Sequence, residues 1–156
     1  MASTKFKGDV TVTGNLTVQG GSAGAIIAVP NANTTILAAN SGKPHIIANV
    51  SADRTFTLPP AAAGLNYEFI AEVGSADGHD WIFATAATAT LFKGGLLMVD
   101  TDAGPATSAA VVADQSDDDQ LQVNLPQGGT KVEMYCDGTS WIVSGVVLST
   151  AAAVFS

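Results

Sequence analysis

The chain has 156 residues, of which 47% are hydrophobic and only 13% are charged. This balance excludes a disordered tail and predicts one domain with a buried core, part of whose surface other subunits cover. Six Lys and Arg residues against fourteen Asp and Glu residues give a formal charge of −8, so we expect no nucleic-acid partner. We also expect no membrane span and no secretory signal, because no run of about 18 apolar residues occurs and the start, MASTKFKGDV, has no apolar segment.

The first 21 residues are predicted to form an extended arm, followed by a globular β domain over residues 22–156. The arm contains the stretch GDVTVTGNLTVQGG, in which Val and Thr alternate and glycine recurs every six residues. A two-residue turn at the second glycine would mix apolar and polar side chains on both faces. A three-residue loop instead pairs Val12 with Leu16 and Val10 with Val18 on one apolar face. The six-residue period also allows a third arrangement, in which Val10 lies over Leu16 and Val12 lies over its counterpart in a neighbouring copy of the chain.

The apolar side of this arm, formed by Val10, Val12, Leu16 and Val18, is a candidate assembly contact. A two-stranded ribbon of this size is marginal in water by itself, so we expect the body of the domain or another chain to cover it. The tail, STAAAVFS, ends in a further apolar pair, Val154 and Phe155, which we also expect to dock on another surface.

Nine short strands are predicted after the arm, separated by turn residues such as Pro-Asn, Asn-Ser-Gly and Gly-Gly. They cover Ala25–Val29, Thr34–Ala38, His45–Val50, Arg54–Leu58, Tyr67–Val73, Trp81–Ala84, Leu96–Asp100, Ala109–Ala113 and Gln120–Leu125, and a C-terminal hairpin follows them. Many short strands with frequent turns predict an all-β fold, either a compact β-sandwich or a barrel.

The C-terminal hairpin is predicted in the stretch KVEMYCDGTSWIV, with a two-residue turn at Asp137-Gly138. This turn pairs Cys136 with Thr139 and Met134 with Trp141. One face of the hairpin then carries Val, Met, Cys and Trp toward the core, and the other face is mostly polar. We expect Cys136, the only cysteine, to be a buried thiol without a nucleophilic role.

The acidic run Asp117-Asp118-Asp119, with Asp114 before it, offers oxygen ligands suited to a hard cation such as Ca²⁺. The run lacks the glycine and the closing glutamate of an EF-hand loop, and successive aspartates point in different directions on an extended chain. We therefore favour a solvated acidic loop over a metal site, and we expect no cofactor.

His45 and His79 have no second nitrogen or sulfur ligand at a known metal spacing, so we expect neither to be a metal ligand or a catalytic residue. His79 is predicted to lie with Asp77 and Asp80 in a surface hairpin loop, whereas His45 begins a predicted strand. Phe69, Trp81 and Phe83 lie at alternate positions that one hairpin would place on a single face, so a shared core is favoured over a carbohydrate platform. The sequence contains no nucleophile elbow, phosphate-binding loop or dinucleotide fingerprint, and we expect the chain not to be an enzyme.

Three stretches, Gly8–Gly21, Arg54–Ile70 and Lys131–Gly145, together about a third of the chain, resemble motifs of tailed-bacteriophage virion proteins. The first is similar to the glycine-spaced Val/Thr repeats at the start of fibre and capsid-surface proteins. The other two, with the patterns TLP…AG…Y.F and DGT.W, resemble paired motifs in small β domains of phage structural proteins. A long collagen-like or coiled stem is missing, so the resemblance favours a capsid decoration (cement) protein over a fibre.

The resemblance implies a homotrimer on the outer capsid surface of the virion, assembled in the bacterial cytoplasm, with the major capsid protein as its partner. The domain would clamp neighbouring capsomers, and the arm would add a strand to the shell or to the next subunit. Two other classes remain as alternatives. One is a tail-fibre or receptor-binding protein that recognises a host surface ligand, and the other is an enzyme, such as a depolymerase, with two close carboxylates.

Overall fold

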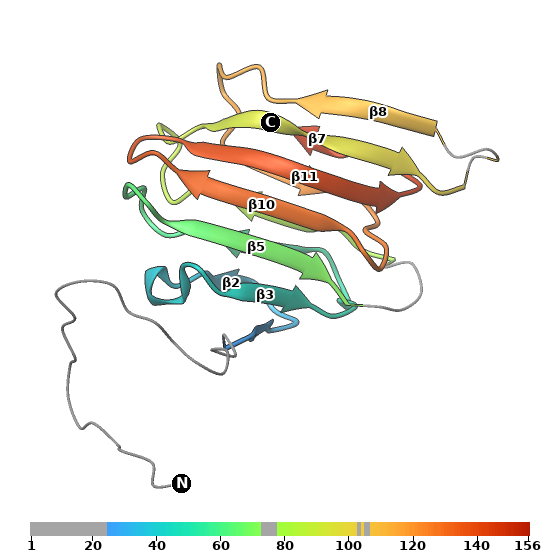
Figure 1. The fold of residues 1–156 in the computed structure, drawn as a ribbon, viewed down its shortest axis with the longest axis horizontal. Coiled ribbons are helices and arrows are strands. Elements are labelled where there is room, and N and C mark those ends of the chain that lie inside the picture. The colour runs from blue at the N-terminus through green and yellow to red at the C-terminus, as the bar shows by residue number, and fades with distance from the viewer. Residues whose placement is uncertain (1–24, 73–77, 103, 105–106) are drawn as a thin grey trace, which may run out of the picture.

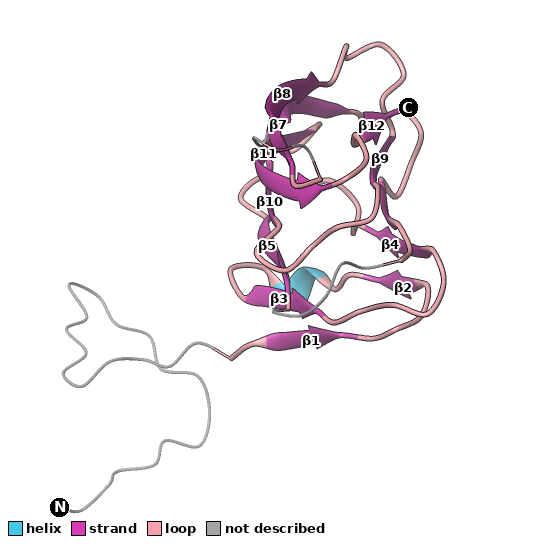
Figure 2. Ribbon diagram, turned by 90° about the vertical axis from the view of Figure 1, so that its right-hand side faces the viewer, coloured by secondary structure: helices cyan, strands magenta, loops and turns pink. Residues whose placement is uncertain are grey.

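The computed structural model describes residues 25–72, 78–102, 104 and 107–156. Two mixed β-sheets pack face to face in a sandwich, which confirms the predicted all-β class (Figure 1, Figure 2). The arm with Val10, Val12, Leu16 and Val18 lies outside the described residues, so its contacts stay a prediction.

The described chain forms twelve strands and one short 3₁₀ helix. They are β1 (Ile27–Val29), β2 (Thr34–Thr35), η1 (Ala38–Asn40), β3 (Pro44–Ile47), β4 (Arg54–Thr57), β5 (Asn66–Ala71), β6 (Trp81–Ala84), β7 (Phe92–Asp100), β8 (Thr107–Val112), β9 (Gln120–Val123), β10 (Lys131–Cys136), β11 (Trp141–Ser149) and β12 (Val154–Phe155). The seven-stranded sheet has the order β1-β3-β5-β10-β11-β7-β8, and the five-stranded sheet has the order β12-β9-β6-β4-β2.

The first six strands alternate between the two sheets. β1, β3 and β5 are parallel neighbours in the seven-stranded sheet, while β2, β4 and β6 are parallel neighbours in the five-stranded sheet. Parallel neighbours need a crossover connection, and here each crossover passes through a strand of the opposite sheet. This part of the chain therefore winds as a coil around the core. The later strands add mostly antiparallel pairs to both sheets, apart from the parallel pair β7 and β11.

The aromatic side chains of the core come from both sheets. Phe69 lies on β5 and Phe83 lies on β6, and their ring centroids are 4.7 Å apart across the interface between the sheets. Both side chains are fully buried, and Trp81 is 1% exposed. The predicted core role of these aromatics is confirmed, but their placement on one hairpin is wrong, because β5 and β6 belong to opposite layers.

The C-terminal hairpin forms with its predicted core face and a different register. Cys136 pairs with Trp141 and Met134 pairs with Val143, so the connecting loop has four residues instead of two. The reason is Asp137, whose Oδ1 accepts hydrogen bonds from the backbone N–H groups of Thr139 (2.8 Å) and Ser140 (2.8 Å). A shift of two residues keeps every side chain on the same face of a strand, and the inward side chains are therefore still the expected ones.

Candidate functional site

The two tail residues predicted as contacts lie in a strand of the chain's own body. Val154 and Phe155 form β12, which pairs with β9. The Phe155 ring is half-buried, and its centroid lies 6.2 Å from that of Phe92. Val154 is 47% exposed and remains available to a partner. The tail therefore docks on its own domain through Phe155, while an outward contact through Val154 stays a prediction.

A row of apolar side chains crosses the outer face of the seven-stranded sheet, and the sequence analysis did not find it. Adjacent strands place its members side by side, in the order Ala28, Ile46, Ile70, Lys131, Val146, Leu97 and Ala110. We call these seven residues the outer row. Lys131 is its one charged member. Leu97 is 46% exposed and Val146 is 38% exposed, so large apolar side chains face solvent in the middle of the sheet.

Lys131 is held in the outer row by two carboxylates. Its Nζ lies 2.7 Å from Glu68 Oε1 and 2.7 Å from Glu133 Oε1. The hydrogen bonds that Lys131 donates to Glu133 and Glu68 raise its pKa above the ordinary value, and the same contact lowers the pKa of Glu133. The charge of Lys131 is thus paired within the sheet, although the three groups together keep a net charge of −1. The apolar side chains remain the main feature of the row.

A shallow hollow of about 420 Å³ lies beside the outer row, over β5, β10 and β11. Its walls include the exposed ring of Tyr135, the side chain of Ile142 and the polar residues Asn66, Glu133 and Ser144. An exposed aromatic ring next to amide, hydroxyl and carboxylate groups is suited to a small polar ligand such as a sugar.

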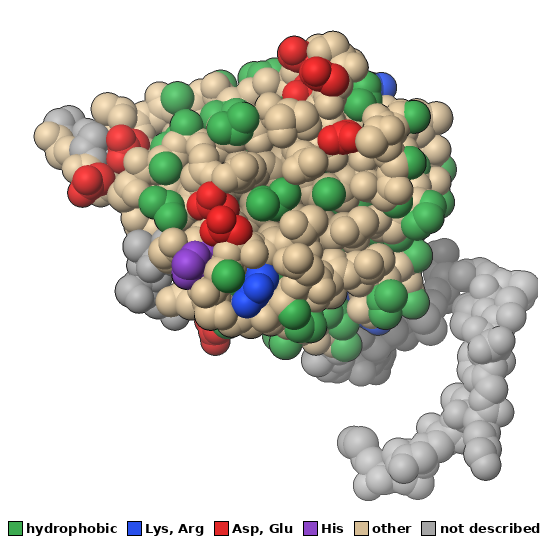
Figure 3. Space-filling model, turned by 180° about the vertical axis from the view of Figure 1, so that it is seen from behind, with side chains coloured by type: hydrophobic (Ala, Val, Ile, Leu, Met, Phe, Trp, Pro, Cys, Tyr) green, Lys and Arg blue, Asp and Glu red, His purple; other side chains and the backbone are tan. Residues whose placement is uncertain are grey.

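The opposite face of the molecule has a different character. Figure 3 shows that the hydrophobic side chains on that side are scattered, separated by polar atoms and backbone and by small groups of acidic residues. Scattered surface hydrophobics are normal in soluble domains, whereas large exposed apolar side chains that lie side by side, such as Val146 and Leu97, are a feature of interaction surfaces. The seven-stranded sheet is therefore the candidate functional face.

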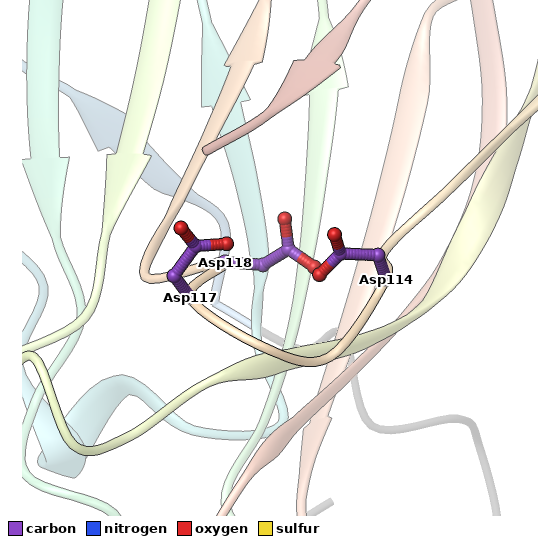
Figure 4. A group of neighbouring side chains, drawn as sticks. All are labelled: Asp114, Asp117 and Asp118. Atoms are coloured by element: carbon purple, nitrogen blue, oxygen red, sulfur yellow. The ribbon is translucent and has the colours of Figure 1, made fainter.

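Three of the four predicted acidic residues meet in one loop after β8. Carboxylate oxygens of Asp114, Asp117 and Asp118 lie within 4.8 Å of one another, whereas Asp119 is not a member of the group (Figure 4). The carboxylates accept hydrogen bonds from donors within the loop. Asp118 is 4% exposed and accepts a 2.8 Å hydrogen bond from the N–H of Gln115, and Asp114 accepts bonds from the N–H and the hydroxyl of Ser116.

These contacts account for the shape of the acidic loop. Gln115 has a positive φ of 69°, and the hydrogen bond to Asp118 holds it there. The hydroxyl and N–H of Ser116 lower the pKa of Asp114. The spacing of the oxygens would also suit a hard cation, but the loop geometry is explained by its own donors, and we propose no metal function for it.

The strand predicted to begin at His45 is present, and it turns this side chain toward the core. His45 lies on β3 and is fully buried, packed against the rings of Tyr67 (5.4 Å between centroids) and Phe69 (5.1 Å). Its Nδ1–H donates a 2.8 Å hydrogen bond to the carbonyl of Lys43, and burial lowers the pKa of the ring. The expected burial of Cys136 is confirmed, because its side chain is fully buried in the core.

His79 and its acidic neighbours have structural roles as far as they are described. His79 Nδ1 lies 3.6 Å from Asp53 Oδ1 near the surface. Asp80 accepts hydrogen bonds from the Gln122 side chain (2.7 Å) and from the N–H of Leu125 (3.1 Å), which fixes the loop after β9. These contacts position loops of the five-stranded sheet.

The comparisons with known proteins leave the family open. No family model matches the chain, and neither the curated proteins nor the solved structures give a significant match. Within the described part of the chain, no helix is long and apolar enough to cross a membrane.

Proposed function

We propose that this protein is a structural component of a tailed-bacteriophage virion, a capsid decoration (cement) protein. In this proposal it forms a homotrimer that binds the major capsid protein on the outer surface of the head and stabilises the shell. The observation that carries the proposal is the outer row, an apolar line across a whole sheet face in an acidic chain. Such a surface is typical of a protein that is covered by partners.

The ion pairs of Lys131 support a lasting contact at this face. Lys131 already has two carboxylate partners, so covering the outer row would not leave its ammonium group buried and unpaired. Burial of the exposed Leu97 and Val146 side chains would each contribute roughly 1–2 kcal/mol before the cost of ordering. Repetition around a trimer would multiply this gain, which suits a protein that must hold many capsomers together.

A second function, receptor binding by a tail protein, is favoured by the hollow beside the outer row. Its exposed Tyr135 and neighbouring polar groups have the chemistry of a sugar site. In this case the protein would sit at the tip of the tail and bind a host surface ligand. The two proposals differ in location, and one image of labelled particles separates them.

The first experiment is negative-stain imaging of virions labelled with an antibody against this chain. Decoration predicts label over the head, and receptor binding predicts label at the tail tip. The second experiment adds purified chain to capsids that lack it and measures the amount retained after sedimentation. Deleting residues 2–20 is expected to reduce retention at least about tenfold, since loss of a few apolar contacts costs more than 1.4 kcal/mol.

The substitution Val146→Asp tests the outer row in the same assay. It is expected to reduce retention by a similar factor, because it adds a third carboxylate beside Lys131, which already has two, and so buries surplus negative charge in the proposed interface. Thr55→Asp makes the same charge change on the other sheet, at a half-buried position of β4, and is expected to retain capsid binding. Undiminished retention of both the deletion and Val146→Asp would reject the role of the arm and of the outer row.

A further inference from the structure

The described sheets have four edge strands, and one differs from the others. β1 has three residues, and β2 and β12 have two each, which is too short to template another strand. β8 has six residues, Thr107–Val112, with the sequence TSAAVV. It is the last strand of the seven-stranded sheet, at the far edge from β1 (Figure 1, Figure 2).

β8 lacks the features that normally protect an exposed edge. It contains no charged residue and no proline, and five of its six residues are exposed. The N–H of Ala113, just after the strand, donates to the carbonyl of Gly94 on β7. Because backbone groups alternate along an antiparallel ladder, the N–H and C=O groups of Ser108, Ala110 and Val112 point away from β7. The outer edge of β8 therefore presents a regular set of donors and acceptors.

A hollow of about 280 Å³ lies under this edge. It is lined by Met98 of β7, by Thr107 and Ala109 of β8, and by Thr150 and Ala152 of the loop before β12. A strand added to β8 would thus have one face toward a partly apolar hollow and the other toward solvent. An added strand that alternates apolar and hydroxyl side chains would match these two surfaces.

Acidic residues lie at both ends of β8. Asp100 is the cross-strand partner of Thr107, the first residue of the strand, and Asp114 follows the last residue by two positions. Residues 1–24 hold two of the six Lys and Arg residues and one of the fourteen Asp and Glu residues, a charge of +1. The rest of the chain holds four and thirteen, a charge of −9. The start of the chain is therefore electrostatically complementary to the ends of β8 in either strand direction.

We infer that the outer edge of β8 binds the N-terminal arm of a second copy of this chain as an added β-strand. The stretch Asp9–Thr13, DVTVT, supplies alternating valine and threonine side chains, with the valines toward the hollow. Lys5 and Lys7, which precede it, lie near the acidic residues at one end of β8. The inference deepens the proposed function, on which it rests for the assembly role of the arm.

The position of the chain start favours the arm of a second copy. Ala25 lies beside β1, at the edge of the sheet opposite β8. Six strand spacings of about 4.8 Å separate β1 from β8, so the chain's own arm would have to cross roughly 29 Å of sheet. The segment from residue 13 to residue 24 spans at most about 40 Å, so most of its length would have to lie across one face of the sheet to reach β8. An arm from a neighbour has no such constraint.

Disulfide trapping between two differently labelled chains tests this inference without any capsid. One full-length chain carries a cysteine at one of positions 9 to 13 in turn, and the other carries Ala110→Cys on β8. The control acceptor is Ala28→Cys on β1, an exposed alanine at the opposite end of the same outer row. The native Cys136 is buried and does not compete. The two chains are unfolded, mixed, refolded together and oxidised, and linked pairs are measured on a denaturing gel.

We expect at least one arm position to link to Ala110→Cys about tenfold or more faster than to Ala28→Cys. A chain that carries Ala110→Pro and the wild-type arm should not associate. Proline removes an N–H that points away from β7, and the hydrogen bonds between β8 and β7 remain. The circular dichroism spectrum of this variant should remain that of the folded chain.

Three results would overturn the inference. One is equal linking to both alanine positions, and another is no linking at any arm position. The third comes from one further chain that carries both an arm cysteine and Ala110→Cys: linking only within this chain would show that the chain's own arm occupies β8. None of these results depends on capsid binding, which the retention assay measures separately, so failure of the inference and failure of the proposed function can be distinguished.

Discussion

Replacing Phe83 with alanine is expected to lower the free energy of unfolding by about 3–5 kcal/mol. Phe83 is fully buried on β6, and its ring lies 4.7 Å from that of Phe69 on the opposite sheet and 5.7 Å from that of Phe56. Removing it would leave a cavity where the two sheets meet. Urea unfolding followed by tryptophan fluorescence measures the change, with all variants at one protein concentration because association contributes to stability.

Ile82→Ala is the matched control for this prediction. Ile82 is adjacent on the same strand but points to the outer side of the five-stranded sheet and is only half-buried. We expect it to cost about 1 kcal/mol. If Phe83→Ala does not fold, Phe83→Leu can be measured in its place, and we expect it to lower the free energy of unfolding by about 1–2 kcal/mol. Equal losses from Phe83→Ala and Ile82→Ala would contradict the description of the core.

Gly145→Ala is expected to cost at least about 3 kcal/mol, for two separate reasons. Gly145 lies on β11 with φ of 143°, a conformation that residues with a side chain rarely adopt. An added Cβ would also lie 2.2 Å from the carbonyl oxygen of Lys131 on β10. The backbone of the central hairpin would have to move, which disturbs the sheet on both sides of β11.

Gly64→Ala separates the two causes. Gly64 has φ of 90°, and no described atom lies within 4 Å of the position that a Cβ would take. It therefore carries only the conformational cost, about 1–2 kcal/mol. Thermal or urea unfolding of both variants gives the difference. A loss at Gly145 no larger than the loss at Gly64 would mean that β10 and β11 are not as close as the structure places them.

Glycine also explains one strand boundary that the sequence analysis missed. Gly94-Gly95 reads as a turn, so the prediction began the strand at Leu96, whereas β7 begins at Phe92. Both glycines are needed for close backbone contact: a Cβ on Gly94 would lie 2.4 Å from the carbonyl oxygen of Val143. A glycine pair in a strand and a glycine pair in a turn have the same local sequence. Only the neighbouring strand distinguishes them.

The local pattern of the sequence was sufficient to predict which side chains of the C-terminal hairpin are buried. Alternation in β10 and β11 correctly predicted that Val132, Met134 and Trp141 face the core, even with the wrong register. The pairing of strands was not predictable in the same way. Parallel pairs such as β3 with β5 join residues more than 20 positions apart, and no turn motif marks them. The burial of His45 was not predicted for this reason, since it depends on the rings of Tyr67 and Phe69 on β5.

The candidate face depends on the same long-range pairing. Ile70, Val146 and Leu97 are distant in the sequence and form a continuous row only because β11 pairs with β10 on one side and with β7 on the other. Each of them lies next to at least one buried residue on its own strand, and nothing in the local sequence marks it as part of a shared surface. The tail was partly predictable, since Phe155 docks as expected of an apolar terminus, although its acceptor is the chain itself.

Sedimentation equilibrium of the purified full-length chain is the most direct test of whether its apolar surface and open edge exist to bind other copies. The result we expect is a complex of three chains, about three times the 15.7 kDa mass of one chain, that persists on dilution. A species of 15.7 kDa at every concentration would contradict the proposal.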